Sequence, residues 1–548
     1  MKTIYSVLMI FFFVMSLKAQ VTFQWSYIYD VSSLRDALES TSVDNQGNVF
    51  LAGNRIIAGS KYEPFIARVS TTGSLQYSRS FSHPYGDNPI GKGCYFRSAA
   101  ADNQGNVVVA GVIDSGIGVT KGVVLKYNSA GDTVWGRYSG INDTLGNCWW
   151  GDVKLDNSGN IYVAGHSIKY SPTRIVYITA KYNQNGVLLW LKGYSPSAFY
   201  DLGYGYRNLL ELDNGGNVYY ATSYQKTSSS GSHDIFVTKL NSSGSLLWTK
   251  SFNGAGDKDD FVNDLAVDAA GNVYAAGLSN NLNSNAEMLC VKFNSANGST
   301  EWANYINGTG TFGNDEFFGI SVYGNDVYPA GTIYNTGSGH DAILVKFNSS
   351  GAEQWRKVES AGGDEMVKDV KTDPSGVYTV SNFTSGTYSV KTSKYNFSGD
   401  TLWNTSYHVN THNELAKFIN VGPSNNVYIS GDENFINSGY VYLVRYTNNI
   451  TGVHNDPVMS PNKFMLSQNY PNPFNPSTKI NFNIPVSGFV ELTIFDVTGR
   501  TVETPVRSVM MAGSHSIEFN AASLPSGVYF YRLETESFAD TKKMILTK

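Results

Sequence analysis

Hydrophobic and polar residues alternate over short distances through most of the chain. Between residues 261 and 306, apolar segments rich in aromatic and β-branched residues are separated mostly by Gly, Asn and Ser turns; they are Phe261–Val267, Val273–Gly277, Leu289–Asn294 and Trp302–Ile306. Short segments with this composition are typical of antiparallel strands. The pattern predicts an all-β chain with four strands in this stretch.

A unit of four such segments recurs along the chain. Its first turn has the form Asp-x-x-Gly-Asn-Val-Tyr-x-Ala-Gly, and successive copies, three of them degenerate, begin 49 to 58 residues apart at Asp44, Asp102, Asp156, Asp213, Asp268, Val322, Asp373 and Gly422. The last segment of a unit carries an aromatic residue, namely Tyr77, Trp135, Trp190, Trp248, Trp302, Trp355 or Trp403. Four antiparallel strands repeated at this spacing are the signature of a β-propeller blade.

The two ends of the repeat region are complementary. The eighth unit has its third strand, Tyr440–Tyr446, but no fourth, and the composition changes at Thr447. At the other end, the segment Gln24–Tyr29 carries Trp25 and has no unit before it. We therefore predict an eight-bladed β-propeller over residues 20–446, closed by the N-terminal strand, which removes the free edge of an open array.

Charge and cysteine content exclude several classes of protein. The 548 residues include 40 basic and 45 acidic side chains, for a net charge of -5, so nothing electrostatic favours nucleic acid or an anionic membrane as a partner. The three cysteines are too few for a disulfide framework or a multi-cysteine zinc site.

The first nineteen residues have the pattern of a secretory signal peptide. Lys2 precedes the apolar run 4–17, and the small residue Ala19 precedes Gln20. This apolar run is short for a bilayer span, and no later segment is apolar enough to cross a membrane. We predict a cleaved signal peptide over residues 1–19 and no membrane span.

The C-terminal region has a different composition. It contains Pro471-Asn-Pro-Phe474-Asn-Pro476, then the alternating residues Ile480, Phe482 and Ile484, then Phe495-Asp-Val-Thr-Gly499, Leu524-Pro-Ser-Gly527 and Lys542-Lys-Met544. Over residues 464–548 this sequence resembles the type A C-terminal sorting domain of type IX secretion cargo. Alternating strands between Pro and Gly turns independently predict a small β-sandwich.

The resemblance implies a route of export. Such cargo folds in the periplasm of a Gram-negative bacterium and crosses the outer membrane through a translocon that recognises the sorting domain. The domain is then usually cleaved, and the passenger is released or attached to surface lipopolysaccharide. Residues 447–463, which include Gly452, Pro457 and Pro461, are the predicted linker. We expect an extracellular or cell-surface protein.

The repeats themselves resemble those of bacterial extracellular β-propeller proteins. Their Asn-x-x-Gly-x-x-x-Trp hairpins also resemble the tryptophan-docking hairpins of eight-bladed quinoprotein dehydrogenases. Those enzymes typically carry two adjacent cysteines over the quinone, and no two cysteines are adjacent in this chain. The resemblance therefore bears on the blade count and does not supply the chemistry.

Acidic residues precede the first strand of several units. Asp36, Asp260, Glu365 and Glu414 lie eight positions before the turn residue. Equivalent propeller loops converge near one face of the central channel, so these carboxylates are candidates for a partial ring that binds a cation such as calcium, or a polyhydroxylated ligand. The alternative is that each carboxylate caps its own loop.

Cys94 and Cys148 occupy the same offset in the second and third units. Export permits a disulfide between them, provided that the two Cα atoms approach within about 7 Å. The alternative is two separately buried thiols. Cys290 is interpreted as a small core residue.

Other motifs have simpler interpretations. Gly308-Thr-Gly-Thr-Phe-Gly313 matches a dinucleotide fingerprint, but it lies between two units with no helix after it. His408 and His412 lack the glutamate of a zinc motif. The periodic tryptophans are assigned to packing between sheets. The pair Trp149-Trp150 breaks the repeat and is the preferred carbohydrate-binding candidate, on a loop at the channel face.

Two classes of function fit these features. The first is a non-catalytic binding or structural module on the cell surface, with an extracellular glycan as ligand. The second is an extracellular enzyme on a propeller scaffold, such as a polysaccharide lyase, a hydrolase or a quinone-dependent dehydrogenase. A cluster of acid, base and aromatic groups with displaced pKa values would favour the enzyme.

Overall fold

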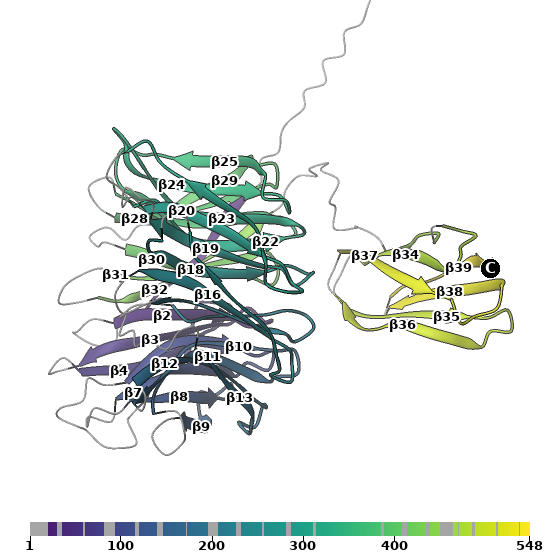
Figure 1. Ribbon diagram of the computed structural model, residues 1–548, viewed down its shortest axis with the longest axis horizontal. Helices are drawn as coiled ribbons and strands as arrows, with labels where there is room; N and C mark the ends of the chain where they lie inside the picture. The colour runs from purple at the N-terminus through teal and green to yellow at the C-terminus, as the bar shows by residue number, and fades with distance from the viewer. Residues whose placement is uncertain are drawn as a thin grey trace, which may run out of the picture. The chain divides into compact units, whose positions relative to one another are not determined.

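The structure is a computed structural model (Figure 1). It describes residues 20–29, 36–57, 61–81, 94–114, 120–139, 146–170, 173–195, 207–225, 232–254, 257–280, 286–310, 314–384, 388–407, 414–433, 439–449, 464–469, 471–484, 488–510, 513–535 and 537–547. The predicted signal peptide, His408, His412 and positions 450–463 of the predicted linker lie outside these residues. The chain forms two compact units, residues 1–452 and 453–548.

Strands are the only regular elements in the described part of the first unit, and the all-β prediction is confirmed. Seven four-stranded antiparallel sheets consist of consecutive strands. They are β2 (Asp36–Val43), β3 (Val49–Ile57), β4 (Lys61–Val69) and β5 (Leu75–Ser80); β6 (Cys94–Ala101), β7 (Val107–Asp114), β8 (Thr120–Tyr127) and β9 (Thr133–Ser139); β10 (Asn147–Leu155), β11 (Ile161–Tyr170), β12 (Thr173–Tyr182) and β13 (Leu188–Tyr194); β14 (Leu209–Leu212), β15 (Val218–Gln225), β16 (His233–Leu240) and β17 (Leu246–Phe252); β18 (Asp260–Val267), β19 (Val273–Asn280), β20 (Ala286–Phe293) and β21 (Thr300–Ile306); β22 (Glu316–Tyr323), β23 (Asp326–Asn335), β24 (Gly339–Phe347) and β25 (Glu353–Glu359); and β26 (Glu365–Asp373), β27 (Gly376–Thr384), β28 (Tyr388–Tyr395) and β29 (Thr401–Tyr407).

One further sheet of this unit joins the two ends of its chain. It contains β30 (Glu414–Gly422), β31 (Asn426–Glu433), β32 (Val441–Asn449) and the N-terminal strand β1 (Gln20–Tyr29), which pairs antiparallel with β32. In this pairing Ile28 lies opposite Tyr442 and Trp25 lies opposite Arg445. The first strands of successive sheets contact one another from β2 through β6, β10, β14, β18, β22 and β26 to β30, and β30 contacts β2.

A repeated contact links the outer part of each sheet to the next. In the sheet of β10 to β13, the Trp190 indole N–H and the Lys181 ammonium group both donate to the carbonyl oxygen of Ser242, at 3.3 and 3.4 Å. The indole lies against Gly244, whose φ of +78° places it in the left-handed region. Trp25 makes the same contact across the last sheet boundary, because its indole donates to Thr71 at 2.9 Å. The periodic tryptophans therefore pack between sheets.

The second unit contains two sheets around one hydrophobic cluster. The first sheet has β33 (Met465–Leu466), β34 (Ser477–Ile484) and β37 (Gly513–Asn520); the second has β36 (Thr501–Met510), β35 (Gly488–Phe495), β38 (Gly527–Thr535) and β39 (Ala539–Leu546). Side chains from both sheets, such as those of Phe482 and Leu492, are fully buried in this cluster. Phe474, from the Pro-rich segment, is also buried there, and its backbone N–H donates to Ile545 O at 2.9 Å.

Candidate functional site at the first strands of the sheets

The predicted acidic residues lie at the starts of first strands. Asp36, Asp260, Glu365 and Glu414 are the first residues of β2, β18, β26 and β30, and Asp315 directly precedes β22. Each lies two residues before a β-bulge in the pairing of the first strand with the second. Equal positions relative to the bulges show that the repeat offset read from the sequence corresponds to a real structural position.

The structure does not gather these carboxylates into one cluster. Asp36 is fully buried and accepts from the Arg55 guanidinium at 2.9 Å within its own sheet. Asp260 accepts from the backbone N–H of Gly254 at 2.6 Å, and burial raises its pKa to about 6. Among the described residues, no group of three or more His, Cys, Asp or Glu side chains is arranged to hold a metal ion. The contacts therefore favour local capping over a ring.

Glu414 and Asp315 follow the same rule. Glu414 is fully buried and its Oε1 accepts from the Tyr440 hydroxyl at 3.2 Å. Asp315 accepts from the backbone N–H groups of Gly308 and Tyr334 at 2.7 and 2.6 Å. The glycine-rich segment that begins at Gly308 is thus a loop between β21 and β22, anchored by a carboxylate, and its residues 311–313 lie outside the described ranges.

Of the two alternatives for Cys94 and Cys148, a disulfide or two separately buried thiols, the structure has the second, because both thiols are free and buried. Cys94 packs in the hydrophobic cluster between the sheet of β2 to β5 and its own sheet. Cys148 packs in the next cluster, where its sulfur lies close to Gly122 on β8. Each thiol faces the preceding sheet, so the two side chains point into different layers. Burial raises the pKa of Cys94 to about 12.

Trp149 and Trp150 lie within strand β10, so the prediction that they occupy a loop is wrong. Trp150 is 1% exposed and belongs to the core between sheets. Trp149 alternates with the buried Cys148 and Trp150, is partly exposed, and stacks on His166 of β11 at a centroid distance of 4.9 Å. Burial lowers the pKa of His166 to about 4, so this ring is neutral at pH 7.

Aromatic residues recur at the position of Trp149 in other first strands. Tyr95 of β6 occupies it in the preceding sheet and packs against Tyr62 of β4, with ring centroids 4.7 Å apart and ring planes tilted by 42°. Phe261 of β18 also occupies it, beside His233 at 5.1 Å. Tyr62, Tyr95 and Trp149 are all partly exposed. We call these three residues the aromatic row. Of these three residues, only Trp149 is identified from the sequence as a carbohydrate-binding candidate, because a single Tyr or Phe in a predicted strand does not stand out from the other strand residues.

Charged residues further along the first strands were not anticipated from the sequence. Lys154 of β10 pairs with Glu211 of β14 at 2.6 Å, and Lys371 of β26 pairs with Asp369 at 2.8 Å. The neighbouring carboxylates, with Glu211 the largest contributor, raise the pKa of Lys154 despite its burial. The side chains of Lys154 and Lys371 are 37% and 42% exposed, so water reaches both pairs.

Three further carboxylates connect adjacent sheets through the backbone. Asp152, Asp264 and Asp369 follow the bulges of their strands and accept from the backbone N–H groups of Leu210, Ile320 and Ile419 in the next sheet, at 3.0, 2.9 and 3.0 Å. Burial raises the pKa of Asp152 and of Asp264. These acids are satisfied by structural hydrogen bonds.

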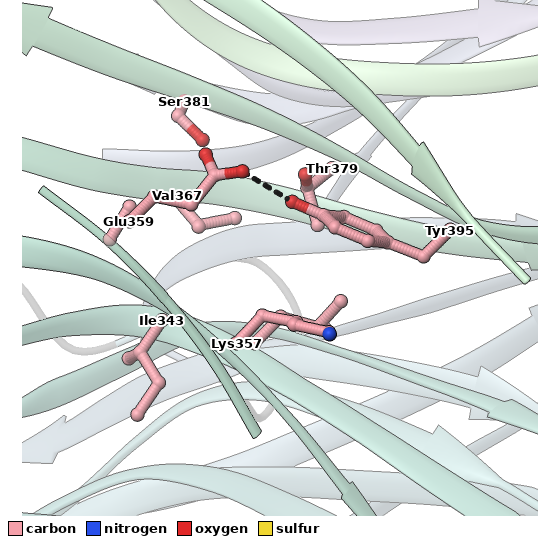
Figure 2. A pocket seen from close by; sticks show the side chains of 9 residues that line it. Ile343, Lys357, Glu359, Val367, Thr379, Ser381 and Tyr395 are labelled. Carbon is pink, nitrogen blue, oxygen red and sulfur yellow. Dashed lines mark hydrogen bonds between the residues drawn. The ribbon is translucent and has the colours of Figure 1, made fainter. Parts of the chain in front are cut away.

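One small pocket lies between the sheets of β22 to β25 and β26 to β29 (Figure 2). Its lining includes Lys357, Glu359 and Tyr395, and the Tyr395 hydroxyl donates to Glu359 at 3.0 Å. The space open to the centre of a water molecule is about 10 Å³. Such a space holds about one water molecule and excludes a sugar or a cofactor.

Family models match two parts of the chain. The model of the secretion system C-terminal sorting domain matches residues 468–547, and that of the β-propeller repeat matches residues 247–283. The chain is therefore a β-propeller repeat protein with a type IX secretion sorting domain, as the sequence predicts. The sorting domain implies passage through the type IX machinery to the cell surface or the extracellular space.

Several solved structures are similar in fold. Quinohemoprotein alcohol dehydrogenase from Comamonas testosteroni is 12% identical with a TM-score of 0.48, covering 82% of this chain and 80% of that one. PorZ, a surface component of the type IX secretion system of Porphyromonas gingivalis, is 12% identical with a TM-score of 0.35 and coverages of 92% and 74%. The β-propeller domain of the Trilobed protease from Pyrococcus furiosus is 7% identical with a TM-score of 0.37 and coverages of 67% and 95%.

No activity is transferred from these structures, because their TM-scores are below 0.5 and their identities are 12% or less. A search of curated proteins finds no significant match. Across the described ranges, no helix is long and apolar enough to span a bilayer.

Proposed function

We propose that this protein is an extracellular, non-catalytic glycan-binding module delivered by type IX secretion. Its first unit is an eight-bladed propeller closed by β1, and its second unit is a β-sandwich that carries the export signal. The aromatic row is the glycan-binding surface. The observation that carries the proposal is the placement of Tyr95 and Trp149 at the same position of two adjacent first strands.

Three observations support the closed eight-bladed ring. The described residues 20–449 hold eight four-stranded sheets, their first strands contact one another in succession, and the last first strand contacts the first one. The pairing of β1 with β32 fills the fourth position of the last sheet. In a closed ring the last sheet has no unpaired strand edge where a fourth strand is missing. Unpaired edges favour aggregation, so closure suits a protein that works outside the cell.

Stacking on sugars supports the choice of ligand. Aromatic rings present an apolar face to the C–H groups of a pyranose. The Tyr62 and Tyr95 rings pack against each other at a tilt of 42°, and Trp149 is stacked on a neutral His166. The row is therefore preorganised for a flat, uncharged ring.

The arrangement of the acids supports binding over catalysis. A glycoside hydrolase needs two carboxylates on opposite sides of one bond. Here Asp36 and Asp152, on the strands nearest the aromatic row, are occupied by Arg55 and by backbone N–H groups. A lyase or hydrolase site would need these groups to be released. We therefore propose no catalytic residue.

A glycan array with purified protein tests the ligand, and two substitutions test the site. Trp149→Ala and Tyr95→Ala are each expected to weaken binding about 5- to 30-fold, since stacking contacts of this kind contribute about 1–2 kcal/mol. Tyr138→Ala, which removes an aromatic side chain that is 42% exposed on the outer strand β9, is the matched control. Binding that survives both substitutions in the row contradicts the proposed site.

Export is tested separately. Deletion of residues 464–548 is expected to leave the protein in the periplasm, because the translocon recognises the sorting domain. We further propose cleavage within residues 447–463 and either release or attachment to lipopolysaccharide. Mass spectrometry of the secreted protein identifies its C-terminus, and secreted protein that retains residues 464–548 contradicts cleavage.

A further inference from the structure

Two buried carboxylates lie at the boundary between the sheets of β22 to β25 and β26 to β29. Asp341 of β24 and Glu365 of β26 are each 3% exposed. The strands β24 and β26 are in contact, and the Thr332 hydroxyl donates to the backbone carbonyl oxygens of both residues. The two acids therefore lie on facing strands of neighbouring sheets.

In each carboxylate, one oxygen accepts hydrogen bonds and the other has no hydrogen-bond partner. Asp341 Oδ2 accepts from Asn335 Nδ2 at 2.8 Å and from Ser338 Oγ at 2.7 Å. Glu365 Oε1 accepts from the backbone N–H of Gly363 at 3.2 Å. Asp341 Oδ1 and Glu365 Oε2 are buried with no hydrogen-bond partner. Burying a charged oxygen without a partner is unfavourable, so such a pair is expected to take up either a cation or a proton.

In another sheet, carboxylates at equivalent strand positions are neutralised by an arginine side chain. In the sheet of β2 to β5, Arg55 pairs with Asp36 at 2.9 Å and with Glu63 at 3.3 Å. Arg55 lies opposite Glu63 in the pairing of β3 with β4, and the residue opposite Asp341 in the pairing of β23 with β24 is Ile333. The apolar Ile333 provides no charge, and among the described residues no ion pair neutralises Asp341 or Glu365, so a bound cation is a candidate to do so.

We propose that a calcium ion binds between β24 and β26, with Asp341 Oδ1 and Glu365 Oε2 as its charged ligands. A neutral oxygen lies beside the pair, because the Thr332 hydroxyl donates to the backbone carbonyl oxygens of Glu365 and Asp341, at 3.0 and 3.4 Å. Calcium accepts hydroxyl, carbonyl and water oxygens alongside carboxylates. Two carboxylates suit the weak sites of extracellular modules, with Kd on the order of 10⁻⁴ to 10⁻³ M.

The ion acts as a clamp between two neighbouring sheets. Its binding stabilises the folded state because the two ligands are brought together only when the sheets are packed. We expect 10 mM calcium to raise the Tm of the chelator-treated full chain by about 1–3 °C, and 10 mM magnesium to raise it less, because magnesium demands a stricter octahedral shell.

Substitutions locate the ion. In Asp341→Asn and Glu365→Gln the calcium-dependent shift in Tm is expected to disappear, whatever the Tm of the variant without calcium. Asp36→Asn is the matched control. Asp36 is also the first residue of a first strand, but Arg55 already neutralises its carboxylate, so this variant should keep the calcium-dependent shift in Tm. A shift that persists in Glu365→Gln overturns the proposal.

Equilibrium dialysis with radioactive calcium on the wild-type full chain is independent of how the variants fold. We expect at least one calcium ion per chain to bind with a Kd below about 1 mM. No binding at 5 mM calcium overturns the proposal and indicates that the two carboxylates share a proton instead. Glycan binding at the aromatic row is a separate property, so its failure leaves this test unaffected.

Discussion

Replacement of Trp25 by alanine tests how the N-terminal strand is held. The Trp25 indole lies over Gly73, donates to Thr71 O at 2.9 Å and is partly exposed. A fully buried Trp→Ala change costs about 3–5 kcal/mol, so a partly exposed indole contributes about 2 kcal/mol of packing. The lost hydrogen bond adds about 1 kcal/mol. We expect the docking of β1 to weaken by about 3 kcal/mol.

Native-state hydrogen exchange measures this effect directly. A loss of about 3 kcal/mol raises the population in which β1 is detached by about 100-fold, so the amides of Gln20–Tyr29 should exchange about 100-fold faster. Trp135→Ala is the matched control, because Trp135 makes the same kind of contact with Gln184 and Gly186 while its strand β9 is tethered to β8 by a tight turn. Unchanged exchange in β1 of Trp25→Ala refutes the reasoning.

The remaining predictions concern packing, pH and inter-sheet hydrogen bonds. Gly244→Ala should lower the free energy of unfolding, measured by urea denaturation, by about 2–4 kcal/mol, because a Cβ would lie 2.6 Å from the Trp190 ring at a φ of +78°. Gly324→Ala is the control: its φ is +62° and a Cβ would meet open space, so the loss should be about 1 kcal/mol. Because burial holds the pKa of His166 near 4, its contribution to stability is complete above pH 6.5 and is lost as the pH falls through 4. Between pH 7 and pH 4 the wild type should therefore lose up to about 3 kcal/mol more stability than His166→Gln, and parallel pH profiles would contradict this. Asp152→Ala should cost about 2–4 kcal/mol, since the buried backbone N–H of Leu210 loses its acceptor, and Asp152→Asn should cost clearly less by the same denaturation assay.

The turns could be read from the sequence because their chemistry is local. In the first repeat, the Asp44 carboxylate accepts from the backbone N–H groups of Gln46 and Asn48 at 2.9 and 2.8 Å, and Gly47 adopts a φ of +84°. Every atom in this arrangement lies within five residues. The type IX sorting domain was recognisable for the same reason, since its Pro-rich segment and its turns are short contiguous motifs.

Contacts between sheets could not be read in this way, because they depend on which face of a strand each side chain occupies. Equivalent positions on packed sheets are separated by about 10 Å, which exceeds the reach of a disulfide. Cys94 and Cys148 are such a pair, and each faces the sheet that precedes it. The hydrogen bond from Leu210 to Asp152 joins residues 58 apart, so no local pattern announces it.

Differences between repeats locate the proposed binding surface. The docking position keeps an aromatic residue from one repeat to the next, as Trp135, Trp190 and Trp248 do. The position of Trp149 changes instead from one first strand to another, through Ala37, Tyr95, Trp149, Phe261, Glu316, Met366 and Leu415. The side chains at that position are partly exposed while their neighbours in sequence are buried. Repeated sheets differ in surface chemistry at such a position, and the aromatic residues that β6 and β10 carry there are the basis of the sugar-binding surface that we propose.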